Sequence, residues 1–117
     1  MDERLPAHLE VSGLIRAVQA AGGFATVLAK GERDAGTLLV VCCHNATRDG
    51  PLARAFERMP LPDGTRDWGL AKSQDPENPY DFSEYCTRRH QQDPDLWVLE
   101  LDIADAERFI GHPGTRG

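Results

Sequence analysis

The chain has 117 residues, a size typical of one compact domain, and its hydrophobic and charged fractions are 40% and 27%. Its net charge of −6 and scattered basic residues disfavour nucleic-acid binding, which depends on neutralising phosphates. The sequence contains neither an apolar run near the roughly 20 residues of a membrane span nor a secretory signal. We therefore expect a single cytoplasmic domain over residues 1–117, with reduced cysteines and a frayed tail over residues 111–117.

The first predicted element is an amphipathic helix from about Ala7 to Ala21. Val11, Leu14 and Val18 recur there at helical spacing, which places them on one face. Gly22-Gly23 follows as a C-terminal stop signal.

The next segment has the pattern of a β-hairpin with a long tip. Two apolar runs, Phe24–Ala29 and Thr37–Cys43, flank the polar loop Lys30–Gly36. Both faces of the second run are apolar, which predicts a central strand that helices or a second subunit cover on both sides.

The rest of the chain alternates apolar segments with turns. Leu52–Met59 fits either a third strand or a short helix, and its place between two turn clusters favours a strand. Asp81 and Glu84 have the spacing of a capping box for a second helix. The other predicted elements are, in chain order, a short strand at Thr65–Ser73, that helix at about Phe82–Gln92, a strong strand at Leu96–Leu101 and a last helical turn at Ala104–Ile110.

These elements predict an α+β fold. The short turns between strands favour a mainly antiparallel sheet of four to five strands, with two main helices packed on it. Because helices segregate onto one face in such layouts, we expect two layers.

One set of residues has the side chains of a zinc site. Cys42 and His44 share a face of a strand, and Cys86 and His90 share a face of a helix, so the four would meet if that helix packed over that strand. The alternative is that both cysteines are small core residues, and we favour it. Cys43 and His44 are adjacent on a strand, so their side chains point to opposite faces and do not form a nucleophile–base pair.

A second set combines the charged loop with the terminal strand. Carboxylates near that strand suit acid–base work or cation binding, and a tryptophan suits an interface. The candidate binding residues are Lys30, Arg33, Asp34, Asp95, Trp97 and Glu100.

Two blocks also carry a family resemblance. GGFATVLAKGERDAGTLLV, from Gly22 to Val40, and QQDPDLWVLELD, from Gln91 to Asp102, resemble the bacterial family of domain of unknown function 1491. The preceding helix, VSGLIRAV, completes the resemblance, and residues 45–79 depart most from it. The resemblance implies a stand-alone cytosolic domain and transfers no catalytic residue. It also implies a strand near Leu52–Met59.

These observations favour a small cytoplasmic binding or protein-interaction domain without catalytic activity and without a cofactor. We expect a protein partner, and a homodimer as well, because two helices are few to cover both faces of a sheet. The alternative is a small hydrolase or nuclease that uses the charged loop together with Asp95 and Glu100.

Overall fold

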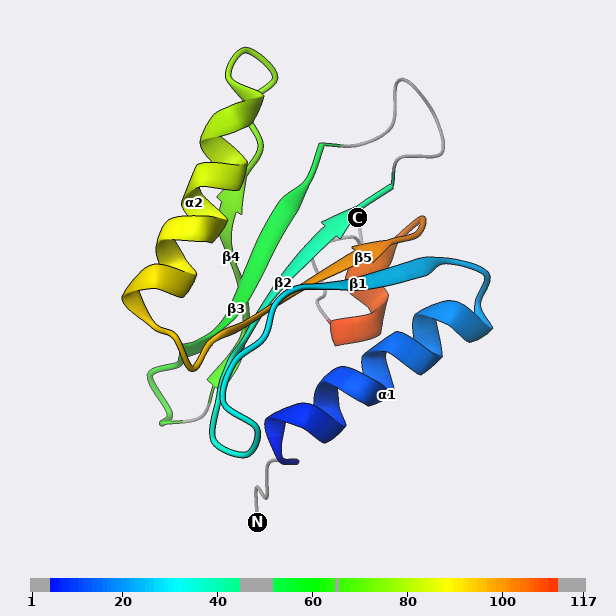
Figure 1. The fold of residues 1–117 in the computed structure, drawn as a ribbon, viewed down its shortest axis with the longest axis vertical. Helices are drawn as coiled ribbons and strands as arrows, with labels where there is room; N and C mark the ends of the chain where they lie inside the picture. Colours follow the sequence, from blue (N-terminus) through cyan, green and yellow to red (C-terminus); the bar gives the residue numbers. More distant parts are fainter. Residues whose placement is uncertain (1–4, 45–51, 65, 112–117) are drawn as a thin grey trace.

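The structure is a computed structural model that describes residues 5–44, 52–64 and 66–111. Two long helices pack on a five-stranded sheet with the strand order β1-β5-β2-β3-β4, an α+β fold (Figure 1). The elements are α1 (Ala7–Ala20), β1 (Phe24–Ala29), β2 (Leu38–Cys43), β3 (Arg54–Pro60), β4 (Arg66–Ser73), α2 (Pro79–Gln92), β5 (Trp97–Asp102) and a 3₁₀ helix, η1 (Ala106–Ile110). Most of the predicted tail, residues 112–117, lies outside the described residues.

Both strands of the predicted hairpin are present, as β1 and β2, but they do not pair with each other. β1 pairs antiparallel with β5, and β5 pairs parallel with β2, so the last strand of the chain lies between the two. Neighbouring strands lie about 4.8 Å apart, and the loop from Lys30 to Thr37 is long enough to span the roughly 10 Å across an intervening strand. β5 is buried at Leu99 and Leu101 on one face and at Val98 on the other, which favours this position inside the sheet over an edge.

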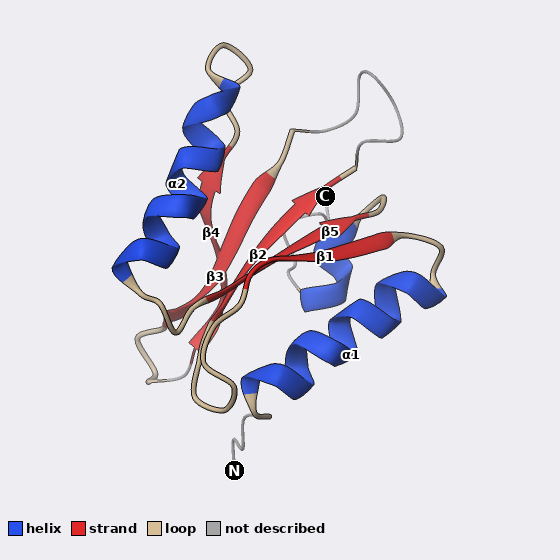
Figure 2. Ribbon diagram, in the orientation of Figure 1, coloured by secondary structure: helices blue, strands red, loops and turns tan. Residues whose placement is uncertain are grey.

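The helices lie on opposite faces of the sheet, so the prediction of two layers is wrong (Figure 2). α1 and η1 pack against one face, where Leu38, Val40 and Leu99 belong to their core cluster. α2 packs against the other face, where Leu39 and Val41 lie. We name these the α1 face and the α2 face. All six residues of β2 are buried, which confirms the prediction of a strand covered on both sides.

The segment Leu52–Met59, for which the sequence fits either a strand or a short helix, is mostly strand. Residues 54–60 form strand β3, which pairs antiparallel with β2 and with β4. α2 begins at Pro79 rather than near Phe82, and Asn78 is its N-cap residue, without a side-chain capping bond. The predicted capping box is therefore wrong, and Asp81 instead forms an ion pair with Lys72 on β4 at 2.6 Å. None of the helices in the described ranges has the length and apolar composition of a membrane-spanning segment.

Candidate functional site: a groove on the α2 face

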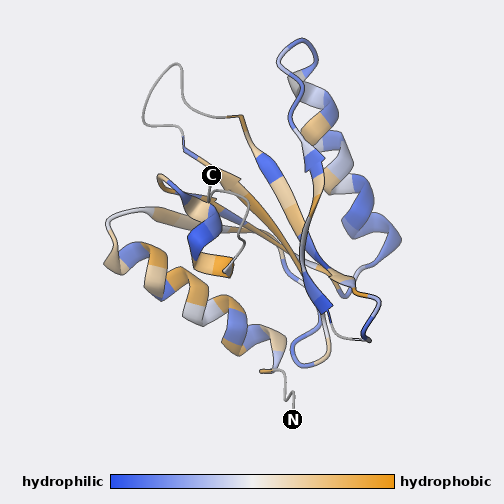
Figure 3. Cartoon of the chain, turned by 180° about the vertical axis from the view of Figure 1, so that it is seen from behind, coloured by the Kyte–Doolittle hydropathy of each residue, from blue (hydrophilic) through white to orange (hydrophobic). Residues whose placement is uncertain are grey.

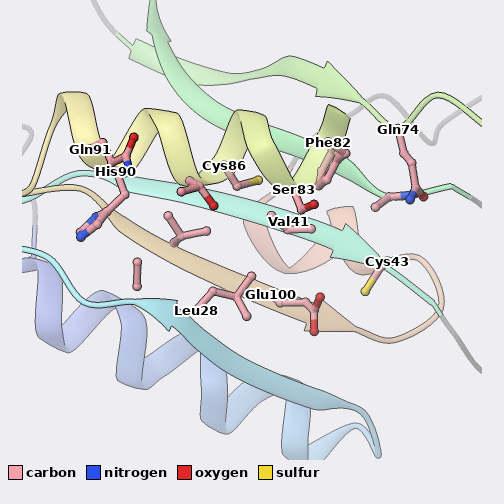
Figure 4. A pocket seen from close by; sticks show the side chains of 14 residues that line it. Leu28, Val41, Cys43, Gln74, Phe82, Ser83, Cys86, His90, Gln91 and Glu100 are labelled. Carbon is pink, nitrogen blue, oxygen red and sulfur yellow. The ribbon is translucent and has the colours of Figure 1, made fainter. Parts of the chain in front are cut away.

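A groove opens on the α2 face, between α2 and β1, and Figure 4 shows it from close by. Its volume is about 640 Å³, within the range of roughly 300–1,000 Å³ that is typical of small-molecule sites. β2 and β5 form its floor, and Leu28, Val41, Phe82 and Val98 are its main apolar residues. The groove therefore offers a ligand a largely apolar surface.

The groove exists because α2 has a narrow apolar face. Figure 3 colours most of α2 as hydrophilic, whereas α1 has a broader hydrophobic side. Phe82 and Cys86, four residues apart, are the α2 residues of the buried cluster, and His90 follows at the same spacing on the groove side. A helix with this pattern covers one strip of the sheet, so part of β5 and β1 stays open.

Glu100 lies on the groove floor because of the alternation along β5. Leu99 and Leu101 point to the α1 face, so Val98 and Glu100 point to the α2 face. The residue opposite Glu100 on β1 is Thr26, an exposed and small neighbour. A ligand can therefore approach the Glu100 carboxylate from the solvent side of the groove.

Among the partly or fully buried glutamates that the structure describes, Glu100 alone makes no hydrogen bond or ion pair. Glu10, Glu57 and Glu107 each pair with an arginine. Glu32 accepts hydrogen bonds from the backbone amides of Asp34 and Ala35. A half-buried carboxylate without a partner costs folding free energy, so Glu100 differs in kind from the other four.

The electrostatics of the groove follow from this arrangement. Burial raises the pKa of Glu100 above its usual value, and the neighbouring Asp102 carboxylate raises it further. Burial, with a contribution from Glu100, raises the pKa of the Cys86 thiol to about 11. Cys86 is therefore an uncharged thiol near neutral pH, which makes it a poor nucleophile.

His90 lines the groove with one ring nitrogen already engaged. Its Nδ1 lies 2.9 Å from the carbonyl oxygen of Leu96. A carbonyl only accepts, so Nδ1 carries the proton and donates, which leaves Nε2 as an acceptor in the neutral ring. Figure 4 places His90 toward one end of the groove and Gln74 and Cys43 toward the other.

The predicted loop site lies elsewhere, at the end of β5. Loop residues contact the segment Asp95–Trp97 through backbone bonds, with Glu32 N–H donating to the Asp95 carbonyl at 2.9 Å. The indole Nε1 of Trp97 donates to the Glu32 carbonyl at 2.8 Å. A Cβ at Gly31 or Gly36 would overlap the Asp95 carbonyl oxygen, which explains both glycines by close approach.

The six predicted binding residues divide among three places. Lys30, Arg33 and Asp34 are on the loop; the latter two are exposed and 3.9 Å apart at their nearest charged atoms. Asp95 is exposed beside the loop, and its N–H donates to the Asp93 carboxylate. The last two members lie on β5: Trp97 is 5% exposed in the core of the α1 face, and Glu100 is on the groove floor.

The alternative zinc set does not come together. Cys42 belongs to the α1 face, whereas Cys86 belongs to the α2 face, because α2 packs on the side of the sheet opposite to Cys42. His44 lies at the end of β2, 3.9 Å from the Asp102 carboxylate. Over the described ranges, no group of three or more His, Cys, Asp or Glu side chains is arranged to hold a metal ion.

Sequence reasoning singled out Glu100 and missed the groove around it. Leu28, Phe82 and Ser83 line the groove and were not among the predicted binding residues. One signal was available, since Glu100 is a lone charge inside the run Leu96–Leu101, whose other residues are all apolar. The insertion of β5 beside β1, which brings Leu28 next to that charge, has no local signature.

Comparison with known proteins places the chain among proteins of undetermined role. The model of the family "Protein of unknown function (DUF1491)" matches residues 5–111. No curated protein matches the chain.

Three solved structures are similar over nearly the whole length. A crystal structure of a DUF1491 family protein from Caulobacter crescentus CB15 has 33% identity and a TM-score of 0.77, and it covers 94% of this chain and 98% of its own. An NMR structure of a DUF1491 family protein from the same organism has 34% identity, a TM-score of 0.75 and coverages of 96% and 97%. The solution structure of protein Atu0922 from A. tumefaciens has 28% identity, a TM-score of 0.67 and coverages of 92% and 93%.

Proposed function

This chain belongs to the DUF1491 family of proteins of unknown function, and from its geometry we propose that it is a binding domain whose ligand site is the groove on the α2 face. The observation that carries the proposal is the pairing of apolar walls with one unpartnered carboxylate in a groove of about 640 Å³. Specific ligand sites combine such walls with a small number of polar groups.

Two observations favour binding over catalysis. The charged loop lies beside Asp95, but Glu100 lies apart from both on the groove floor, whereas acid–base or nucleophilic catalysis needs such groups within hydrogen-bond reach of one substrate. Within the groove, the thiol of Cys86 is held in its neutral form by a pKa raised to about 11.

A fluorescence titration with Nile red, an uncharged apolar dye, tests the groove itself. We expect saturable binding that Gln91→Trp weakens about fivefold or more, because Gln91 lines the groove and an indole there fills part of it. Gln92→Trp is the matched control, since Gln92 is an exposed neighbour outside the groove lining. Equal weakening by both variants, or no saturable binding to the parent chain, would contradict the proposal.

For the protein partner, we propose a second copy of this chain at the free edge of β1. β1 has no charged residue, and Phe24 and Leu28 on it are 73% and 52% exposed. The opposite edge strand, β4, carries Arg66, Asp67 and Lys72, the type of charges that block edge pairing. An uncharged apolar edge is a template for pairing with another strand.

Sedimentation equilibrium tests the dimer with a matched pair of variants. Leu28→Lys places a charge on the β1 edge, and Leu70→Lys places the same charge on β4, where Leu70 is 49% exposed. We expect the parent chain and Leu70→Lys to be dimers and Leu28→Lys to be a monomer. A monomeric parent chain at micromolar concentration would refute the proposal.

We further propose a cytoplasmic location. Cys42, Cys43 and Cys86 are buried and form no disulfide, which suits a reducing compartment. Recovery of the full-length tagged protein outside the cytoplasmic fraction would contradict this location.

A further inference from the structure

We propose that the groove selects organic cations, namely an amine on an apolar body, with the ammonium group at Glu100 and the body on Leu28 and Val98. This inference rests on the proposed binding function and names its ligand class. It has three independent supports: the state of Glu100, the charges around it, and the shape of the apolar surface beside it.

The first support is that Glu100 has no counter-charge, unlike three of the four other glutamates that the structure describes as partly or fully buried. Glu10, Glu57 and Glu107 each lie beside an arginine side chain of the chain itself. Glu100 is half-buried and has no such cation among the described residues. A ligand ammonium group would supply the missing counter-charge and the missing hydrogen bond at once.

The second support is the sign of the charges that face Glu100. On its own strand the nearest titratable group is Asp102, and across β1 its partner is the uncharged Thr26. β2 presents the Cys43 thiol, and α2 presents the Cys86 thiol and the His90 ring. No lysine or arginine of the described residues lines the groove, so its local potential is negative and repels carboxylate or phosphate ligands.

The third support is the shape of the surface next to the carboxylate. Leu28 and Glu100 lie close together along the β1 side of the groove, with Phe82 on the α2 side (Figure 4). An apolar body therefore contacts Leu28 and Val98 while its ammonium group reaches Glu100. The volume of about 640 Å³ accommodates a body the size of one aromatic ring or more.

Three compounds that share one ring test the proposal: benzylamine, benzyl alcohol and benzoate, each titrated by NMR into the full chain. We expect benzylamine to bind at least about tenfold more tightly than benzyl alcohol, which is the lower end of the contribution of one charge-assisted hydrogen bond, and benzoate to bind most weakly. Benzylamine affinity should rise as pH rises through the raised pKa of Glu100, because the carboxyl group loses its proton while the amine keeps its own. Benzyl alcohol affinity should stay constant.

Glu100→Gln should reduce benzylamine affinity to that of benzyl alcohol and leave benzyl alcohol binding unchanged. Glu84→Gln is the matched control, because Glu84 is an exposed glutamate of α2 outside the groove, and it should keep the full preference. Equal binding of amine and alcohol to the parent chain, or an amine preference that survives Glu100→Gln, overturns the inference while the groove proposal stands. Failure of all three compounds to shift any groove residue overturns both.

Discussion

Helices cover the two faces of the sheet to different degrees. The more fully covered face supplies most of the core, and the other face carries the candidate binding groove. On the α1 face, α1 and η1 together cover a large apolar cluster that includes Trp97 and Leu99. On the α2 face, α2 alone covers a smaller cluster and leaves the groove beside β1. The reason is local composition, since the apolar residues of α1 recur along its length and those of α2 form one short strip. One face of this small sheet is therefore built as core, and the other retains a surface that a ligand can contact.

The largest expected effect concerns the cover of the α1 face. Glu107 of η1 is buried and forms an ion pair with Arg54 of β3. Arg54→Ala should lower the free energy of unfolding by about 3 kcal/mol, because it leaves a buried carboxylate without a cation. Urea denaturation measures this, with Arg66→Ala on the exposed edge strand as control and an expected change within about 0.5 kcal/mol. Similar losses in both variants would contradict the role of the pair.

A pair of adjacent valines compares the faces directly. Val40 lies in the α1-face core, and Val41 lies in the α2-face cluster and lines the groove. Val40→Ala should cost about 2 kcal/mol, and Val41→Ala about 1 kcal/mol less, because a truncation beside an open groove creates less enclosed cavity. Equal losses in thermal or urea unfolding would show that the two faces are packed alike.

Trp97 extends the α1-face core to the loop at residues 30–37. Trp97→Phe should cost about 1 kcal/mol, because it keeps the aromatic packing and removes the indole hydrogen bond to the Glu32 carbonyl. Faster amide hydrogen exchange across the loop should accompany the loss. Trp68→Phe, whose ring stacks on the Arg58 guanidinium, should leave loop exchange unchanged. Unchanged amide exchange of the loop in Trp97→Phe would contradict a role of the indole in ordering the loop.

The smallest effect has the opposite sign and lies on the α2 face. Burial raises the pKa of Glu100, so the folded state holds this proton more tightly than the unfolded state. The parent chain therefore loses stability as pH rises from the usual glutamate pKa to the raised one. Glu100→Gln removes that loss and should stabilise the chain near pH 7 by less than about 1 kcal/mol, because solvent screens this partly exposed group, with no gain below the usual glutamate pKa. A destabilised variant at pH 7 would contradict the unpartnered state of Glu100.

The local patterns in the sequence predicted which segments form strands and helices. The apolar runs at 24–29 and 37–43 are strands, and the apolar run at 96–101 is strand β5, inside the sheet between β1 and β2. Their pairing was not predictable from those patterns, because β5 is more than fifty residues from both partners and the two runs look like a hairpin by themselves. Gly31 and Gly36 resembled ordinary turn residues, although their close approach to Asp95 is what lets the loop cross the end of β5.

The sequence predicted one residue of the candidate site, Glu100, but not the groove around it. Glu100 was a candidate as one of the carboxylates at the terminal strand, and it also stands out as a single charge in an apolar run. The groove was not predicted, because both helices were expected on one face of the sheet. Only two of the described residues of α2 are buried, so α2 covers the α2 face incompletely. The same expectation left one face of β2 uncovered, and a dimer was predicted to cover it. β2 is covered within one chain, so the dimer now depends on the apolar edge of β1 instead.

The most direct test of the groove as the ligand site is a methyl NMR titration of valine-labelled protein with benzylamine. The methyl groups of Val41 and Val98 face the groove, whereas those of Val18 and Val40 lie in the α1-face core. We predict saturable shifts of the Val41 and Val98 methyl signals and none of the Val18 and Val40 signals. Shifts confined to the α1-face valines, or no shift at any of the four, would contradict the groove as the binding site.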